Sequence, residues 1–150
     1  MIGALVTGAG TLYIERESRR DAMRVVHHMA ERLSLGEVLA VFPEGTTGDG
    51  THVLPFHANL LQAALATDSP ILPVGLAYLH GHGQARLGEA RRHDAPTYIG
   101  DTTLLASIWR TVKAGNVCAE LRYGPPQRAG GMDRRTWAQV LRRDIGAMLD

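Results

Sequence analysis

Apolar residues follow two alternating patterns along the chain. In residues 18–36 they recur every three or four positions, which places them on one face of a helix. Ser18 is a candidate N-cap of that helix, and Gly36 is a candidate C-terminal cap. Residues 38–42 are apolar without interruption, which predicts a strand that is buried on both faces.

The rest of the chain continues the alternation of strand and helix patterns. Residues 80–96 have no clear period and are predicted to form a loop. The other predicted strands are residues 11–14, 71–79 (interrupted by Pro73) and 117–123. The other predicted helices are residues 60–66, a helix capped by Asp101 or Thr102, and a last amphipathic helix capped by Asp133.

This alternation predicts an α/β fold in which a mainly parallel sheet is flanked by helices. The chain has 150 residues, of which 45% are hydrophobic and 21% charged, and this is enough for one domain with its own core. No linker, repeat or low-complexity segment divides the sequence. We therefore predict a single domain over residues 1–150.

Charge and cysteine content narrow the class of protein. Sixteen basic and fifteen acidic residues give a net charge of +1, so no global charge argument supports nucleic acid as a partner. The single cysteine, Cys118, lies in an apolar run and is predicted to be a small buried hydrophobe. No apolar run approaches the roughly 18 residues of a membrane span, and residues 1–10 lack a signal peptide's basic region. We expect a cytoplasmic protein.

The segment after the predicted buried strand contains the candidate chemistry. Residues 42–47 read Phe-Pro-Glu-Gly-Thr-Thr, which places Glu44 at the carboxyl end of a strand, where open α/β folds bind ligands. Gly45 permits a turn, and the hydroxyls of Thr46 and Thr47 suit a polyol or a phosphate. The alternative is structural, with Glu44 capping the following turn.

Three blocks of the sequence resemble the glycerol-3-phosphate and lysophosphatidic acid acyltransferase family. Residues 42–47 are similar to its Phe-Pro-Glu-Gly-Thr block, and residues 10–16 match its Gly-x-x-aromatic-x-x-Arg block. Residues 71–74, Ile-Leu-Pro-Val, are similar to its later apolar block, and residues 98–123 look like bacterial members. Because three blocks occur in order, the chain is identified as a member of this family.

The resemblance implies a role for each matching residue. Arg16 would pair with the phosphate or head group of the acceptor lipid, and Glu44 would hold the acceptor's glycerol hydroxyls. Gly45 and Thr46 would shape the phosphate end of the pocket. Many members have arginine where this chain has Thr47, and the Thr-Thr version is similar to branches that act on lyso-ornithine lipids.

The resemblance also implies the partners of the reaction. The acceptor would be a lysophospholipid, such as 1-acyl-glycerol-3-phosphate, or a lyso-ornithine lipid. The acyl donor would be acyl-CoA or acyl carrier protein, with no further cofactor. Because these substrates are lipids, we expect the protein to lie peripherally on the cytoplasmic face of the membrane.

The residues that perform the reaction in the family have no counterpart in the sequence. The family uses a His-x-x-x-x-Asp block, in which the histidine is the general base and the aspartate orients it. None of the seven histidines of this chain has an aspartate five positions later. We expect the sequence to be a fragment, incomplete at the N-terminus and inactive alone; the alternative is a non-catalytic lipid-binding remnant or regulatory module.

Three other patterns have a functional and a structural interpretation. His80, His82 and His93 are candidate metal ligands, although a solvated loop without metal is favoured. Residues 8–10, Gly-Ala-Gly, lack the third glycine of a dinucleotide site. The last predicted helix carries Arg134, Arg135, Arg142 and Arg143 beside apolar residues, which fits anionic lipid but more often indicates core packing with a charged outer face.

Overall fold

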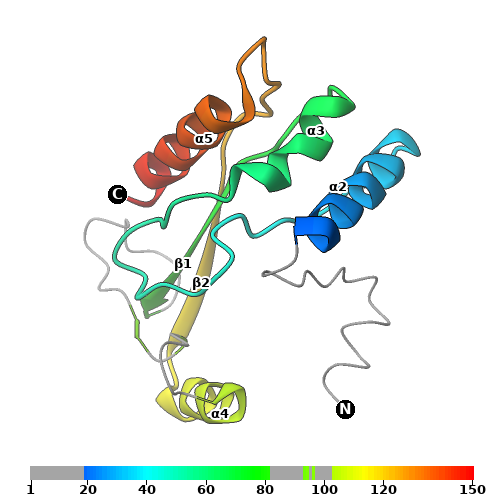
Figure 1. Cartoon of the computed structure of the whole chain (residues 1–150). Helices are drawn as coiled ribbons and strands as arrows, with labels where there is room; N and C mark the ends of the chain where they lie inside the picture. Colours follow the sequence, from blue (N-terminus) through cyan, green and yellow to red (C-terminus); the bar gives the residue numbers. More distant parts are fainter. Residues whose placement is uncertain (1–18, 82–92, 95, 97–102) are drawn as a thin grey trace.

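The structure of the chain is a computed structural model that describes residues 19–81, 93–94, 96 and 103–150. The predicted strand at residues 11–14 and the predicted cap Ser18 lie outside this part. The elements, in chain order, are α2 (Arg19–Ser34), the 3₁₀ helix η1 (Ala58–Leu61), α3 (Gln62–Ala66), β1 (Val74–His80), α4 (Leu104–Ala114), β2 (Val117–Tyr123) and α5 (Arg134–Leu149) (Figure 1).

The sheet formed by the described residues has two strands that run antiparallel. Leu76 of β1 lies opposite Leu121 of β2, and an isolated bridge between Ile71 and Gln127 extends the pairing. The α/β class is confirmed, whereas the predicted parallel arrangement is not. The physical reason is visible in Figure 1, where α4 lies at one end of the strands instead of across a face, so the chain returns beside β1 without a crossover.

The prediction of a buried strand at residues 38–42 is wrong. The segment has no regular secondary structure, and Val38 and Phe42 are 96% and 82% exposed. A run of apolar residues forms a strand only when another strand pairs with it. No strand of the described part pairs with this segment, so its apolar side chains are not buried in a sheet.

The core lies where α5, the η1–α3 segment and the sheet meet. Trp137 of α5 is fully buried and packs with Leu61 and Leu141, while Leu149 at the end of α5 packs on Leu79 of β1. A second contact joins α2 to α3 and buries Val25, Met29 and Ala63. The predicted apolar face of the first helix is therefore confirmed, and three helical segments lie side by side (Figure 1).

The ends of the helices show which capping predictions were correct. Asp133 caps α5, as predicted, by accepting from the backbone N–H groups of Arg135 and Thr136 at 2.8 and 3.3 Å. Gly36 ends α2 with φ +81°, as predicted. The predicted caps of α4 were wrong, because Thr103 caps the helix by accepting from the N–H of Ala106 at 3.2 Å.

The two faces of β1 have different environments. Ala77 and Leu79 are buried on the face covered by α5, whereas Leu76 and Tyr78 are about two-fifths exposed on the other face. Cys118 on β2 is half-buried, not buried as predicted. In the described part of the chain, no helix has the length and hydropathy needed to cross a membrane.

Candidate functional site

The loop at residues 42–47 begins with a β-turn. The N–H of Gly45 donates to the carbonyl of Phe42 at 3.2 Å, which closes a four-residue turn with Pro43 at its second position. Proline at that position and glycine at the fourth are typical of a type I turn. The turn predicted from the sequence is confirmed, although residues 38–42 before it do not form a strand.

Gly45 is required here for steric reasons as well as for its backbone conformation. Its φ is +66°, and a Cβ atom at this position would lie 2.6 Å from Cδ2 of His57. The N–H of His57 in turn donates to the carbonyl of Pro43 at 2.7 Å. The turn is thus held against the start of η1, and a side chain at position 45 would require either the His57 ring or the turn to move.

Glu44 points back onto its own chain. Its Oε2 accepts from the backbone N–H of Leu54 at 2.9 Å, and the side chain is half-buried. Within the described part of the chain, the other carboxylate oxygen has no hydrogen-bond partner. One oxygen of Glu44 therefore has the structural role of holding the backbone of its own chain. The second oxygen can accept a hydrogen bond from a ligand.

Arg142 holds the same segment from the opposite side. Its Nε donates to the carbonyl of Val53 at 2.9 Å, across a sequence separation of 89 residues. Sequence reasoning missed this contact and assigned Arg142 only to a basic helix face. No pattern of neighbouring residues could have revealed this contact, since it depends on how α5 lies relative to Val53, which is distant in sequence.

The remaining residues of the loop are polar and carry no positive charge. Thr46 and Thr47 are exposed, and Asp49 follows them. Hydrogen bonds from the hydroxyl and the backbone N–H of Thr51, at 2.6 and 2.9 Å, hold the pKa of Asp49 below its usual value. Residues 42–50 thus contain two carboxylates and no lysine or arginine.

The predicted substrate-binding residues are only partly brought together by the described structure. Glu44, Gly45, Thr46 and Thr47 lie consecutively on the loop, whereas Arg16 lies outside the described residues. The described loop carries a half-buried carboxylate and, on the next residues but one along the chain, two exposed threonines. Such a set can bind hydroxyl or ammonium groups, because carboxylate oxygens accept and threonine hydroxyls both donate and accept.

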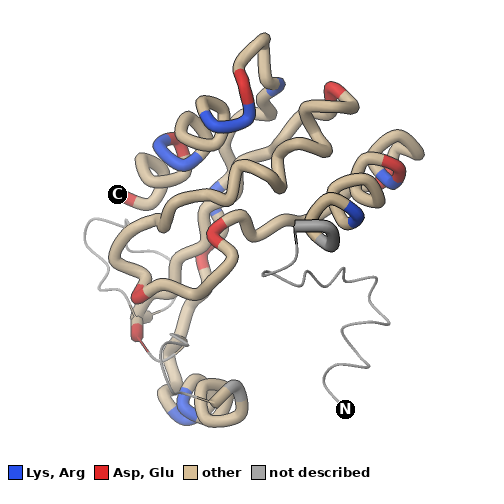
Figure 2. Tube along the Cα trace, in the orientation of Figure 1, with Lys and Arg blue, Asp and Glu red and all other residues tan. Residues whose placement is uncertain are grey.

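The last helix serves the core. Trp137 and Leu141 are buried, and Arg134 donates to the side chain of Gln62 at 3.3 Å. Arg143 pairs with Asp144 at 2.9 Å, and Figure 2 shows acidic as well as basic segments on α5. The prediction of a core-packing helix with a charged outer face is confirmed.

Comparison with known proteins agrees with the three sequence blocks. The model of the family described as Acyltransferase matches residues 1–77, which include the loop of Glu44. The chain is 30% identical over 148 residues to a lyso-ornithine lipid O-acyltransferase of Brucella abortus, with 93% of this chain and 54% of the relative covered.

Other relatives differ in the acceptor that their names give. A lyso-ornithine lipid O-acyltransferase of Pseudomonas aeruginosa is 31% identical over 149 residues, covering 97% of this chain and 53% of the relative. A 1-acyl-sn-glycerol-3-phosphate acyltransferase of Neisseria gonorrhoeae is 33% identical over 125 residues, covering 79% and 46%. The chain thus spans about half the length of these curated relatives. No solved structure matches it.

Proposed function

The chain belongs to the Acyltransferase family, and from this premise we propose that it binds the acceptor in the transfer of a fatty acyl group to the hydroxyl of a lyso-lipid. The observation that carries the proposal is the loop of Glu44, which lies within the family match. Among the described residues, one carboxylate oxygen of Glu44 has no hydrogen-bond partner, and the exposed Thr46 and Thr47 follow it on the same loop.

A lyso-ornithine lipid is the acceptor that this loop fits best. Residues 42–50 carry two carboxylates and no basic side chain, so they would repel a phosphate dianion and attract a cationic amine. An ornithine head group carries such an amine. Glu44 would accept from it, and Thr46 and Thr47 would bind the polar groups next to it.

A second acceptor is 1-acyl-glycerol-3-phosphate, the substrate named for the relative from Neisseria gonorrhoeae. In that case Arg16 would neutralise the phosphate, while Glu44 would bind the glycerol hydroxyls and Gly45 would shape the turn beside them. For either acceptor, acyl-CoA or acyl carrier protein is the proposed donor, and no further cofactor is proposed.

A non-catalytic lipid-binding or regulatory module is the alternative function. It is favoured by one sequence observation, namely that none of the histidines is followed by an aspartate five positions later. Within residues 1–150 no His-x-x-x-x-Asp base is therefore present to remove the proton of the acceptor hydroxyl. Under both proposals the 150-residue chain binds the lyso-lipid without transferring an acyl group.

We also propose that the protein lies peripherally at a membrane surface, and the exposed side of α4 supports this proposal. Leu105, Trp109 and Val112 are each more than three-fifths exposed on this helix. Lys113 lies 5.2 Å above the ring of Trp109, so a cation is placed beside the apolar side chains. This combination fits the interface of an anionic bilayer, where aromatic and basic residues are favoured.

Binding of the two lyso-lipids to the 150-residue chain tests the proposal. The dissociation constants are measured with mixed micelles of lyso-ornithine lipid or of 1-acyl-glycerol-3-phosphate, and products formed with acyl-CoA or acyl carrier protein are analysed by mass spectrometry. We expect tighter binding of lyso-ornithine lipid and no acylated product. Glu44→Gln should weaken binding about tenfold, because glutamine still accepts from Leu54 but has no charge.

Asp49→Asn is the matched control, since it removes the other carboxylate of the same loop while the amide oxygen that replaces it can still accept from Thr51. Equal losses for both variants would mean that only net charge matters. Unchanged binding in Glu44→Gln would contradict the proposed role of Glu44. An acylated product formed by the purified chain would contradict the need for the His-x-x-x-x-Asp block.

A further inference from the structure

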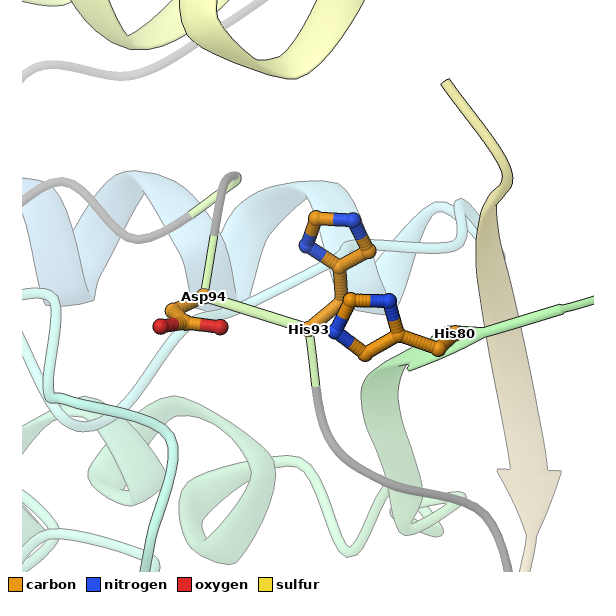
Figure 3. Close-up of side chains that lie close together, drawn as sticks. All are labelled: His80, His93 and Asp94. Carbon is orange, nitrogen blue, oxygen red and sulfur yellow. The ribbon is translucent and has the colours of Figure 1, made fainter. Parts of the chain in front are cut away.

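Two histidines and an aspartate lie close together at the carboxyl end of β1. One nitrogen of His80, one nitrogen of His93 and one carboxylate oxygen of Asp94 all lie within 4.8 Å of one another. Figure 3 shows the two imidazole rings close together with the Asp94 carboxylate beside them. We propose that these three side chains bind a divalent transition-metal ion, with Zn²⁺ as the first candidate.

Backbone hydrogen bonds hold the ligand residues in place. His93 donates its N–H to the carbonyl of Tyr78 at 2.8 Å, which aligns residue 93 with the edge of β1. Gly81, next to His80, donates its N–H to the carbonyl of Asn116 at 3.1 Å, which fixes the end of β1 against the start of β2. Main-chain hydrogen bonds thus place residue 93 beside the end of the strand that carries His80.

The ligand set has the chemistry of a transition-metal site. Two imidazoles and one carboxylate are common ligands of Zn²⁺, and imidazole distinguishes these ions from Mg²⁺ and Ca²⁺, which prefer oxygen. Because His80 and Asp94 are exposed and His93 is half-buried, an ion can reach the cluster from solvent. Three protein ligands leave a fourth tetrahedral position for water.

Binding requires the side chains to rearrange, because the lone pairs of two stacked imidazoles do not point towards one ion. Zinc bonds of about 2.0–2.1 Å in a tetrahedron place ligand atoms roughly 3.4 Å apart. In the structure the three ligand atoms lie within 4.8 Å of one another, so they must move closer to bind one ion. The rings of His80 and His93 stack with centroids 3.9 Å apart and planes inclined by 19°. Rotation about the side-chain bonds would open this stack and turn one nitrogen of each ring towards the ion.

The sequence favoured a solvated loop for these histidines, because no acidic residue lies at a spacing typical of a metal site. The acidic partner is Asp94, which directly follows His93 and was therefore not recognised as a separate ligand. His82, the third candidate ligand from the sequence, lies outside the described residues. The proposed ion would add a second link between residues 93–94 and the end of β1, besides the backbone hydrogen bond of His93 to Tyr78.

Zinc binding to the untagged 150-residue chain tests the proposal. Titration calorimetry with Zn²⁺, and the visible absorption of bound Co²⁺, are measured for the wild type, His80→Ala, His93→Ala and Asp94→Asn. We expect one ion per chain in the wild type and at least about tenfold weaker binding in each variant. Loss of ring stacking on Zn²⁺ addition should also shift the NMR signals of both imidazoles.

Two controls remove the other histidine–carboxylate pairs of the described chain. His27 and His28 lie 3.4 Å from Glu31, and His52 lies 3.9 Å from Asp49, so His27→Ala/His28→Ala and His52→Ala are the matched variants. We expect both to bind Zn²⁺ like the wild type, with circular dichroism confirming the fold of every variant. Absence of binding in the folded wild type, or binding lost only in a control, would overturn the proposal.

Discussion

Glu44 and Arg142 bind the two polar ends of one peptide group. Glu44 accepts from the N–H of Leu54, and Arg142 donates to the carbonyl of Val53, each at 2.9 Å. In a trans peptide these two groups point in opposite directions, so the loop and α5 hold the intervening segment from two sides. A residue proposed to bind the acceptor therefore also positions the backbone beside it.

This arrangement predicts that the two side chains are energetically coupled. Once either contact is lost, the peptide group can shift, and the second contact then contributes less. A double-mutant cycle with Glu44→Ala and Arg142→Ala, measured by urea unfolding, should give a coupling free energy of about 0.5–1 kcal/mol. Arg134→Ala is the control, because Arg134 contacts Gln62 instead, and its effect should add to that of Glu44→Ala. An additive cycle for Glu44 and Arg142 would contradict the shared role.

The contact between Gly45 and His57 predicts unequal effects of two glycine substitutions. Gly45 and Gly50 both have positive φ, but a Cβ atom would clash with His57 only at position 45. Gly50→Ala should reduce the free energy of unfolding by about 1–2 kcal/mol through backbone strain alone. Gly45→Ala should cost at least about 1 kcal/mol more, because the turn and His57 must move apart. Equal effects in chemical denaturation would show that His57 adapts without cost.

Periodic and capping patterns in the sequence predicted most of the described helices and both strands. The apolar face that includes Val25 and Met29 is buried, and Asp133 caps α5, because both features depend on residues near each other in sequence. The Phe-Pro-Glu-Gly turn was predicted for the same reason. Local physical chemistry is sufficient for features of this kind.

Features that depend on distant partners were not predicted correctly. Residues 38–42 were assigned to a strand by their apolar run, although strand formation requires a neighbouring strand. The direction of β2 relative to β1 depends on the place of α4 at one end of the strands, and the contact of Arg142 with Val53 depends on the path of α5. None of these is encoded in the spacing of nearby residues.

The two faces of β1 predict very different costs for removing a leucine side chain. Leu79 is 3% exposed and packs with Leu149 and Ala77, whereas Leu76 on the opposite face is 43% exposed. Leu79→Ala should lower the free energy of unfolding by about 2–5 kcal/mol, and Leu76→Ala by less than about 1 kcal/mol. Thermal and urea unfolding of both variants would measure this. Similar losses would mean that the exposed face is covered in solution.

The surroundings of Trp137 predict that replacing it with phenylalanine lowers the free energy of unfolding less than replacing it with alanine. The side chain is fully buried, yet its Nε1 has no hydrogen-bond partner within the described part of the chain. Trp137→Ala should cost about 3–5 kcal/mol through the cavity it creates. Trp137→Phe should cost less than half of that, because phenylalanine fills more of the indole site than alanine does and leaves no unsatisfied donor there. Equal destabilisation of the two variants in urea unfolding would show that the phenyl ring does not pack in the site.

The cap of α5 predicts a specific dependence of stability on pH. Hydrogen bonds from the Thr136 hydroxyl, and from the N–H groups of Arg135 and Thr136, hold the pKa of Asp133 below its usual value of 3.8. Because the folded pKa is depressed, the ionised carboxylate stabilises the folded state above the unfolded pKa, and this contribution is lost as the pH falls through the folded pKa. Asp133→Asn keeps an acceptor at the cap but cannot titrate.

The free energy of unfolding of the wild type, relative to Asp133→Asn, should therefore be constant from about pH 7 to pH 5 and should decline below about pH 4. Asp144, whose pKa is lowered by Gln127 and Arg143, is present in both proteins, so its titration cancels in the comparison. Urea unfolding at several pH values measures the difference. A difference that grows on acidification would reverse the sign and show that the cap prefers the protonated carboxyl group.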